Sequence, residues 1–127
     1  MANQRALTAS HIRYLLTMNA LDPAGHGVRC VDVATAMNLS KPSVHNMMDT
    51  FSEMGLIRKA SYGTAVFTEE GHRLAERYDR YYQSVSGLLR SGFPDIQNVQ
   101  PAVCALLSEI PEENLEQLCA RPRPPLD

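Results

Sequence analysis

The sequence predicts a mainly α-helical protein, in which a helical dimerisation domain follows a winged helix-turn-helix domain with a two-stranded wing. Apolar side chains over residues 34–54 follow two helical patterns on either side of a tight turn. Residues 56–68 then read as a hairpin, in the position of a wing. From Thr68 onward, apolar residues recur at alternating steps of four and three, which predicts a long helix. The predicted divisions are residues 1–68, residues 69–120 and a disordered tail at residues 121–127.

Size and composition limit the class of protein. A chain of 127 residues with 44% apolar content can bury one real core. No apolar run approaches the ~20 residues that span a bilayer, and the N-terminus lacks the apolar region of a signal peptide. The cysteines Cys30, Cys104 and Cys119 are odd in number and show no C-x-x-C spacing. We therefore expect reduced thiols in a cytoplasmic protein.

The helix-turn-helix prediction depends on the residues around the turn. Asn38 stands where the chain must turn sharply, and Asn tolerates the left-handed conformation better than most residues. Ser40 can cap a helix over residues 41–54, and Pro42 falls in its first turn, where a missing N–H costs little. Ala34 is small where the two helices must cross closely. The predicted apolar face of the second helix carries Val44, Met47, Met48, Phe51 and Met54.

Local signals predict the other elements. Thr8 can cap a first helix ending near residue 19, and another helix covers about residues 31–37. Strands are expected over residues 57–60 and 65–67. Thr68 can cap the long helix, which ends near residue 92. Two shorter helices follow, the first from residue 96 or from Pro101, and the second from Pro111 to about residue 120.

The outward face of the second helix of the motif is polar, which suits contacts with double-stranded DNA. Residues 1–68 hold six Lys/Arg and four Asp/Glu, whereas residues 69–127 hold six and ten. The positive charge thus lies on the half with the motif, where phosphates would bind. The predicted DNA-binding residues are Arg29, Ser40, Lys41, Pro42, Ser43, His45, Asn46, Arg58, Lys59, Tyr62 and Thr64.

The long helix carries an apolar seam with heptad-like spacing. Such a seam packs on a second chain, on the last two helices, or on both. The predicted dimer-interface residues along it are Leu74, Tyr78, Tyr81, Val85 and Leu88.

Two other functions stand beside DNA binding. Some helix-turn-helix units bind protein, so a winged-helix protein-interaction module without DNA binding is the second hypothesis. The small positive excess and the presence of only two lysines keep it open. An enzyme is not expected, since the sequence has no Gly-rich phosphate loop, no Ser/His/Asp or Cys/His arrangement and no zinc-ligand spacing.

Four segments carry a family resemblance. They are R-C-V-D-V-A-T-A-M at residues 29–37, S-K-P-S-V-H-N-M at residues 40–47, M-G-L-I at residues 54–57 and F-T-E-E-G-H-R-L-A at residues 67–75. Over about residues 7–120, the layout resembles the DtxR/MntR family of metal-responsive repressors. The resemblance implies a homodimeric transcriptional repressor whose winged domain reads a palindromic operator. It also implies a site for Mn²⁺ or Fe²⁺ built by the later helices.

The family's metal-ligand positions hold other residue types in this chain. A hydroxyl and an aliphatic side chain cannot replace imidazole and carboxylate at a divalent ion. Cys104 alone retains a ligand type, and its apolar neighbours favour a buried thiol instead. We therefore predict no metal site, with Cys104 as the weak candidate, and a metal response that is lost or altered. The positions in question are Ser10, Tyr82, Ser86, Cys104, Leu107 and Ser108.

Overall fold

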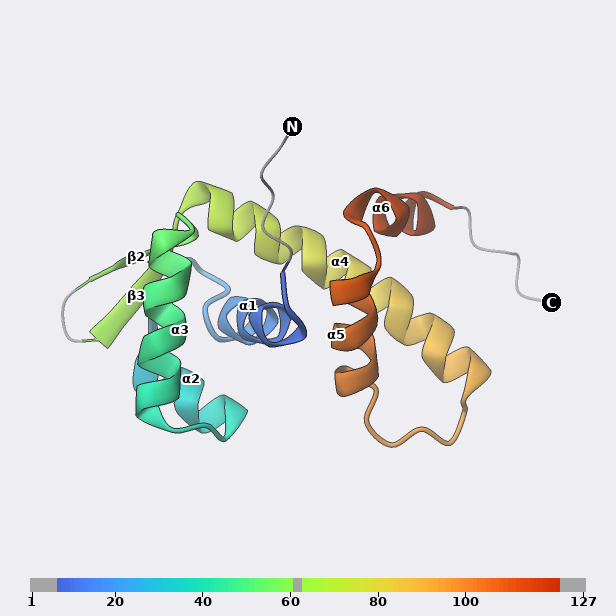
Figure 1. Cartoon of the computed structure of the whole chain (residues 1–127), viewed down its shortest axis with the longest axis horizontal. Coiled ribbons are helices and arrows are strands. Elements are labelled where there is room, and N and C mark those ends of the chain that lie inside the picture. Colours follow the sequence, from blue (N-terminus) through green and yellow to red (C-terminus); the bar gives the residue numbers. More distant parts are fainter. Residues whose placement is uncertain (1–6, 61–62, 122–127) are drawn as a thin grey trace. The chain divides into compact units, whose positions relative to one another are not determined.

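A computed structural model describes residues 7–60 and 63–121, and it confirms a mostly helical winged helix-turn-helix fold (Figure 1). None of its helices is both long enough and apolar enough to cross a bilayer. Tyr62 and the predicted tail from residue 122 onward lie outside the described residues. In chain order, the elements are α1 (Ala9–Leu21), β1 (Val28–Arg29), α2 (Cys30–Met37), α3 (Lys41–Glu53), β2 (Ile57–Lys59), β3 (Thr64–Phe67), α4 (Glu69–Gly92), α5 (Gln100–Glu109) and α6 (Glu112–Ala120).

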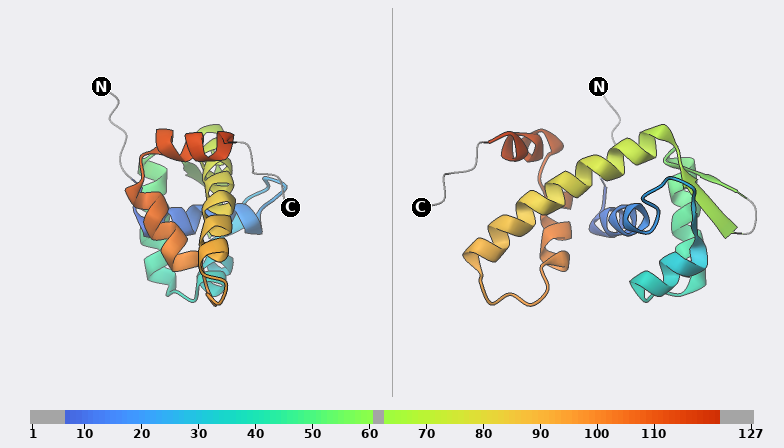
Figure 2. Two further views of the ribbon diagram at one scale, coloured as in Figure 1. Left: turned by 90° about the vertical axis from the view of Figure 1, so that its right-hand side faces the viewer. Right: turned by 180° about the vertical axis from the view of Figure 1, so that it is seen from behind.

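The chain forms two compact units. One is Arg13–Arg77, which we call the helix-turn-helix unit. The described residues before and after it form the other, which we call the helical unit. The division falls within α1 and within the long helix α4, which Figure 2 shows from two further directions. The predicted domain boundaries, with the first at residues 68 and 69, stay a prediction.

The turn between α2 and α3 is fixed by its backbone conformation and by hydrogen bonds. Asn38 adopts the predicted left-handed conformation, with φ 56° and ψ 49°. Its N–H donates to the carbonyl of Thr35 over 3.3 Å. From α1, the guanidinium group of Arg13 donates to the carbonyl of Met37 over 3.3 Å. The last carbonyl groups of α2, which lack partners within the helix, are thus partly satisfied by the turn and by α1.

Helix α3 begins with the predicted cap. The Oγ of Ser40 accepts a hydrogen bond from the N–H of Ser43 over 3.2 Å, and Pro42 lies in the first turn. On the buried face, the ring of Phe51 meets that of Tyr14 edge-on, with centroids 6.2 Å apart. Because this face packs inward, the opposite face is left to solvent. Of the predicted apolar residues, Val44, Met48 and Phe51 are buried. Met47 and Met54 are half-buried.

The wing is part of a three-stranded antiparallel sheet with the order β1-β3-β2. The predicted hairpin of β2 and β3 pairs Arg58 with Val66. On the other edge of β3, β1 pairs Arg29 with Thr64. The third strand was not predicted, because two residues are too short to produce an alternating pattern. The prediction of a two-stranded wing therefore needs this one addition.

Three residues join the end of α3, the start of β2 and the start of α4. Gly55, with φ +78°, follows α3 in the left-handed conformation, as expected for a helix end. The Oγ1 of Thr68 donates to the carbonyl of Gly55 over 2.7 Å and accepts from the N–H of Gly71 over 3.0 Å, which confirms the predicted cap of α4. A Cβ atom on Gly71 would lie 1.9 Å from the carbonyl oxygen of Leu56. Only glycine fits at this position.

The helical unit contains the later part of α4 together with α5 and α6. The rings of Tyr78 and Tyr81 meet edge-on, with centroids 4.9 Å apart. Helix α5 starts next to Pro101, which was one of the two predicted starts. Side chains buried in this unit include Tyr78, Tyr81, Val85, Val103, Cys104, Leu107 and Leu115.

Candidate nucleic-acid interface

The first two turns of α3 carry most of the side chains predicted to contact DNA, and the structure leaves them exposed. The Oγ of Ser40 is engaged, because it caps α3 and donates to the Oγ of Ser43 over 2.9 Å. Both hydroxyl groups therefore lie beside the N-terminus of a 13-residue helix. Pro42 has no N–H group, and the N–H groups of Ser43 and Val44 donate to Ser40, so this terminus offers an anion its positive dipole potential and the N–H of Lys41. The exposed residues of this segment are Ser40, Lys41, Pro42, Ser43, His45 and Asn46.

Asn46 lies on the face of α3 opposite its buried residues. Its side-chain amide has no hydrogen-bond partner within the described residues, while its backbone carbonyl accepts from the Oγ1 of Thr50 over 3.2 Å. An amide with one donor and one acceptor side available is the group that pairs bidentately with adenine in the major groove. Helix α3 thus presents an exposed side-chain amide that no other described group engages.

The cations of the predicted interface differ in their partners. Arg29 forms an ion pair with Asp32 over 3.4 Å, and Lys59 of β2 forms one with Asp49 of α3. Within the described part of the chain, Lys41 and Arg58 form no such ion pair and are exposed. Two of the four predicted phosphate contacts are therefore already neutralised by a neighbouring carboxylate.

The sequence indicates only one of these two ion pairs. The Arg29–Asp32 pair has the i, i+3 spacing of neighbours on a helix, so its signal was present. The Lys59–Asp49 pair joins residues on two different elements, and no local pattern indicates it. Thr64, also predicted to contact DNA, is half-buried in β3 opposite Arg29, so it is less accessible than the other described members of the set.

The predicted dimer-interface residues fall into two groups. Tyr78, Tyr81 and Val85 are at most 6% exposed within the single chain, so their side chains pack inside the protomer. Leu74 is half-buried, and Leu88 is 57% exposed. The burial of Tyr78, Tyr81 and Val85 agrees with a seam that packs on other helices of the same chain, one of the alternatives that heptad spacing leaves open, and their place in a dimer interface stays a prediction. The dimer itself stays a prediction.

The positions that correspond to the family's metal ligands do not fit a divalent ion. Cys104 is 3% exposed and Leu107 is 1% exposed, so both behave as packed apolar groups. Burial raises the pKa of Tyr82, and the neighbouring Cys104 raises it further, so that the phenol stays protonated. No group of three or more His, Cys, Asp or Glu side chains suited to a metal ion occurs within residues 7–60 and 63–121.

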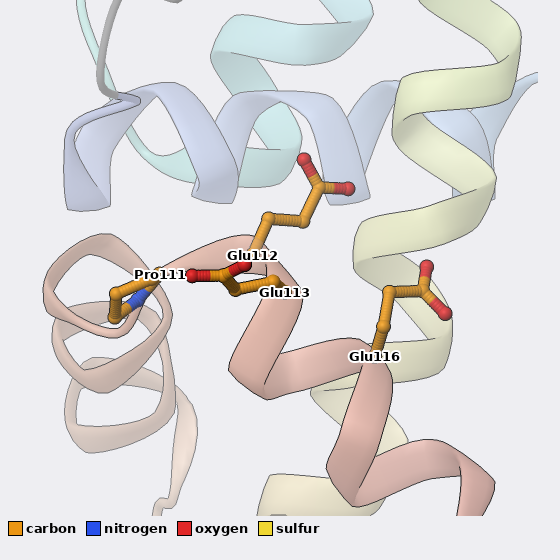
Figure 3. A pocket seen from close by; sticks show the side chains of 4 residues that line it. All are labelled: Pro111, Glu112, Glu113 and Glu116. Carbon is orange, nitrogen blue, oxygen red and sulfur yellow. The ribbon is translucent and has the colours of Figure 1, made fainter.

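A pocket lies at the beginning of α6, lined by Pro111, Glu112, Glu113 and Glu116 (Figure 3). The hydroxyl group of Tyr81 on α4 lies 2.7 Å from a carboxylate oxygen of Glu112 and also contacts Glu116. Burial raises the pKa of Tyr81, and hydrogen bonding to the two carboxylates raises it further. Three carboxylates thus line the pocket, a neutral phenol from α4 contacts two of them, and Arg80 forms an ion pair with Glu116 over 3.1 Å.

Comparison with known proteins agrees with this architecture. Residues 13–61 match the sequence profile of the IclR helix-turn-helix domain. The structure is similar to IdeR of T. acidophilum, with a TM-score of 0.65 and 20% identity over 91% of this chain and 54% of that one. It is also similar to a hypothetical protein from Sulfolobus solfataricus, with a TM-score of 0.60 and 22% identity over 88% and 86% of the two chains.

A further similar structure is ScaR with bound Zn²⁺, with a TM-score of 0.64 and 18% identity over 84% of this chain and 50% of that one. The chain thus spans about half the length of IdeR and of ScaR. No curated protein matches it. The matched domain and the shared fold define a winged-helix protein of the regulator type, and they support a DNA-binding transcriptional regulator.

Proposed function

We propose that this protein is a homodimeric repressor of the DtxR/MntR type that binds a palindromic operator and whose metal response is lost or altered. IdeR and ScaR, which are DtxR-family regulators, share its fold over 91% and 84% of the chain, so the likeness extends beyond the winged domain. The IclR-type match covers residues 13–61 only. Winged domains of different families share their small, turn and core positions, so this segment supports the regulator class more than one family.

The single observation that carries DNA binding is the exposed face at the start of α3. The positive end of the helix and the side chain of Lys41 can bind phosphates, while the exposed Asn46 can reach base edges. Arg58 on the wing supplies a second exposed cation. Phosphate contacts of this kind fix register and give affinity for any duplex, and base contacts by Asn46 then add the sequence preference.

A homodimer would present two copies of the exposed face of α3, one for each half of a palindromic operator. We assign DNA binding to residues 1–68 and dimerisation to residues 69–120, where Leu88 and Phe93 are 57% and 61% exposed. Large exposed apolar side chains are candidates for an interface. A two-fold dimer places its recognition helices one DNA turn, ~34 Å, or a multiple of it apart.

Loss of the metal response is supported by the side chains at the family's ligand positions. Titration calorimetry with Mn²⁺, Fe²⁺ and Zn²⁺ should give no binding in the micromolar range at a defined stoichiometry, because buried Cys104 and Leu107 offer no open set of hard ligands. Tight stoichiometric binding of any of the three ions would contradict this part of the proposal.

One observation favours the second candidate, a winged-helix module that binds protein. Asp32 and Asp49 neutralise two of the four predicted phosphate-binding cations, which weakens the positive potential of the face. A gel shift with the DNA upstream of the protein's own gene separates the two functions. The repressor requires a shift that survives an excess of random duplex, whereas the interaction module requires none.

A further inference from the structure

The exposed face of α3 changes its charge along the helix. Lys41 stands at its start, whereas Asp49 and Glu53 stand in its second half, and Asp49 comes one turn after Asn46. A helix that enters the major groove brings such carboxylates close to the phosphates on either side. The acidic half of α3 therefore opposes binding to DNA unless its carboxylates have a partner.

Asp49 has that partner in the wing. Its carboxylate forms an ion pair with Nζ of Lys59, and the two side chains are 55% and 50% exposed. An exposed ion pair contributes little net stability, so another anion can compete for the lysine. In the free protein, however, the pair keeps the charge of Lys59 from acting on phosphates.

We propose that Asp49 is a specificity-determining residue that restrains Lys59 and thereby weakens binding to random DNA. The inference rests on the proposed DNA-binding function. For Lys59 to contact a phosphate, it must leave Asp49, which then lies unpaired in the negative field of the duplex. The loss of binding free energy from unpaired Asp49 is the same for all DNA sequences, except where a base donates a hydrogen bond to its carboxylate. The amino groups of cytosine and adenine in the major groove do so.

Asp49 therefore has two alternative partners, the lysine of the wing in the free protein and a cytosine or adenine in the correct complex. Random duplexes supply the base partner only by chance, so they bear the full penalty. The expected result is a larger ratio between specific and random binding, at the expense of affinity for both.

If the Lys59–Asp49 pair only supports the wing, the opposite change in affinity for random DNA is expected. If Asp49 only held the wing against α3, its removal would loosen the wing and weaken binding to every duplex. If it restrains Lys59, its removal frees one cation and strengthens binding to random DNA. The direction of the change distinguishes the two roles.

The test compares Asp49→Asn with Glu53→Gln in the full-length protein. Both substitutions remove one negative charge from the exposed side of α3, but of these two carboxylates only that of Asp49 pairs with a cation within the described residues. Binding is measured by fluorescence anisotropy on the protein's own upstream DNA and on a random duplex of equal length, between about 50 and 200 mM KCl. Thermal melting shows that each variant is folded.

Asp49→Asn should bind the random duplex on the order of tenfold more tightly, and the slope of log K against log salt should steepen by ~0.9, as for one added phosphate contact. Glu53→Gln should change the affinity by less than about twofold, because a single exposed charge is screened. Adding Lys59→Met to Asp49→Asn should abolish the gain.

Three results would overturn the inference. They are unchanged or weaker binding of random DNA by Asp49→Asn, an equal gain with Glu53→Gln, and a gain that persists without Lys59. If the wild-type protein binds neither duplex, the proposed function fails and the inference fails with it. If the wild type binds its upstream DNA while Asp49→Asn gains nothing, only the inference fails.

Discussion

The helix-turn-helix unit and the helical unit use polar side chains in opposite ways. In the first, Ser43, His45 and Asn46 lie exposed on a capped helix, and no buried partner restrains them. In the second, the hydroxyl group of Tyr81 is buried against the carboxylates of Glu112 and Glu116. The first unit thus leaves polar groups exposed on α3, whereas the second uses polar groups to connect α4 with α6.

The largest expected effect concerns two glycines of α4, one in each unit. Gly71→Ala places a Cβ atom 1.9 Å from the backbone oxygen of Leu56, so it should destabilise the fold by at least about 3 kcal/mol or prevent folding. Gly87→Ala meets nothing within 4 Å and should stabilise the helix by ~0.5–1 kcal/mol. Urea unfolding followed by circular dichroism measures both. Equal stability of the two variants would show that the start of α4 is not tightly joined to β2.

The next effect concerns the buried phenol. Tyr81→Phe removes the hydroxyl group that donates to the carboxylates of Glu112 and Glu116, and it should cost ~1–3 kcal/mol in the free energy of unfolding. Folding raises the pKa of Tyr81, so its contribution is complete below the unfolded pKa of ~10 and is lost as the pH rises above it. Wild-type stability should therefore fall above about pH 10, and this fall should be smaller in the variant. An unchanged alkaline profile would contradict the assignment.

In the helix-turn-helix unit, Asn46→Ala should affect binding instead of stability. We expect a loss of ~1–3 kcal/mol in specific binding, relaxed preference at one base pair, and unfolding within ~0.5 kcal/mol of the wild type. Ser52→Ala, an exposed change on the same helix outside the predicted contacts, serves as the control. Selection of bound sequences from a pool of randomised duplexes measures the base preference at each position. If the two variants select the same sequences as the wild type, Asn46 does not read a base.

The smallest effect separates the two neighbouring cations of the wing. Arg58→Ala should flatten the slope of log K against log salt by ~0.9, the value for one phosphate contact. Lys59→Ala should flatten it less, since its charge is already paired with Asp49. Anisotropy titrations at several salt concentrations measure both slopes. A larger change for Lys59 than for Arg58 would show that the pair opens freely on DNA.

Local chemistry explains why so much of the helix-turn-helix unit could be predicted. A left-handed Asn38, a capping Ser40 and a helix-ending Gly55 each act within a few residues of their own position, so the sequence alone reveals them. The two-residue strand β1 was missed because its pairing with β3 depends on residues more than 30 positions away. The Lys59–Asp49 pair likewise joins two different elements, and it forms only once the wing lies against α3.

The helical unit was harder to predict for a related reason. The spacing of Tyr78, Tyr81 and Val85 correctly indicated an apolar helix face, but it could not indicate what covers that face. The contact of Tyr81 with Glu112 joins positions 31 residues apart. No periodic pattern carries that information, so the sequence left open whether the seam packs on the last helices or on a second chain.

Hydroxyl-radical footprinting of the upstream DNA tests the central claim most directly, because it records which stretches of the DNA backbone are covered and how far apart they lie. We predict two symmetric protected stretches with centres one helical turn, ~34 Å, or a whole multiple of it apart, and we predict that Asn46→Ala weakens both together. A single protected stretch bound by a monomer, or no protection at protein concentrations that saturate the gel shift, would contradict a dimer that reads DNA with the exposed face of α3.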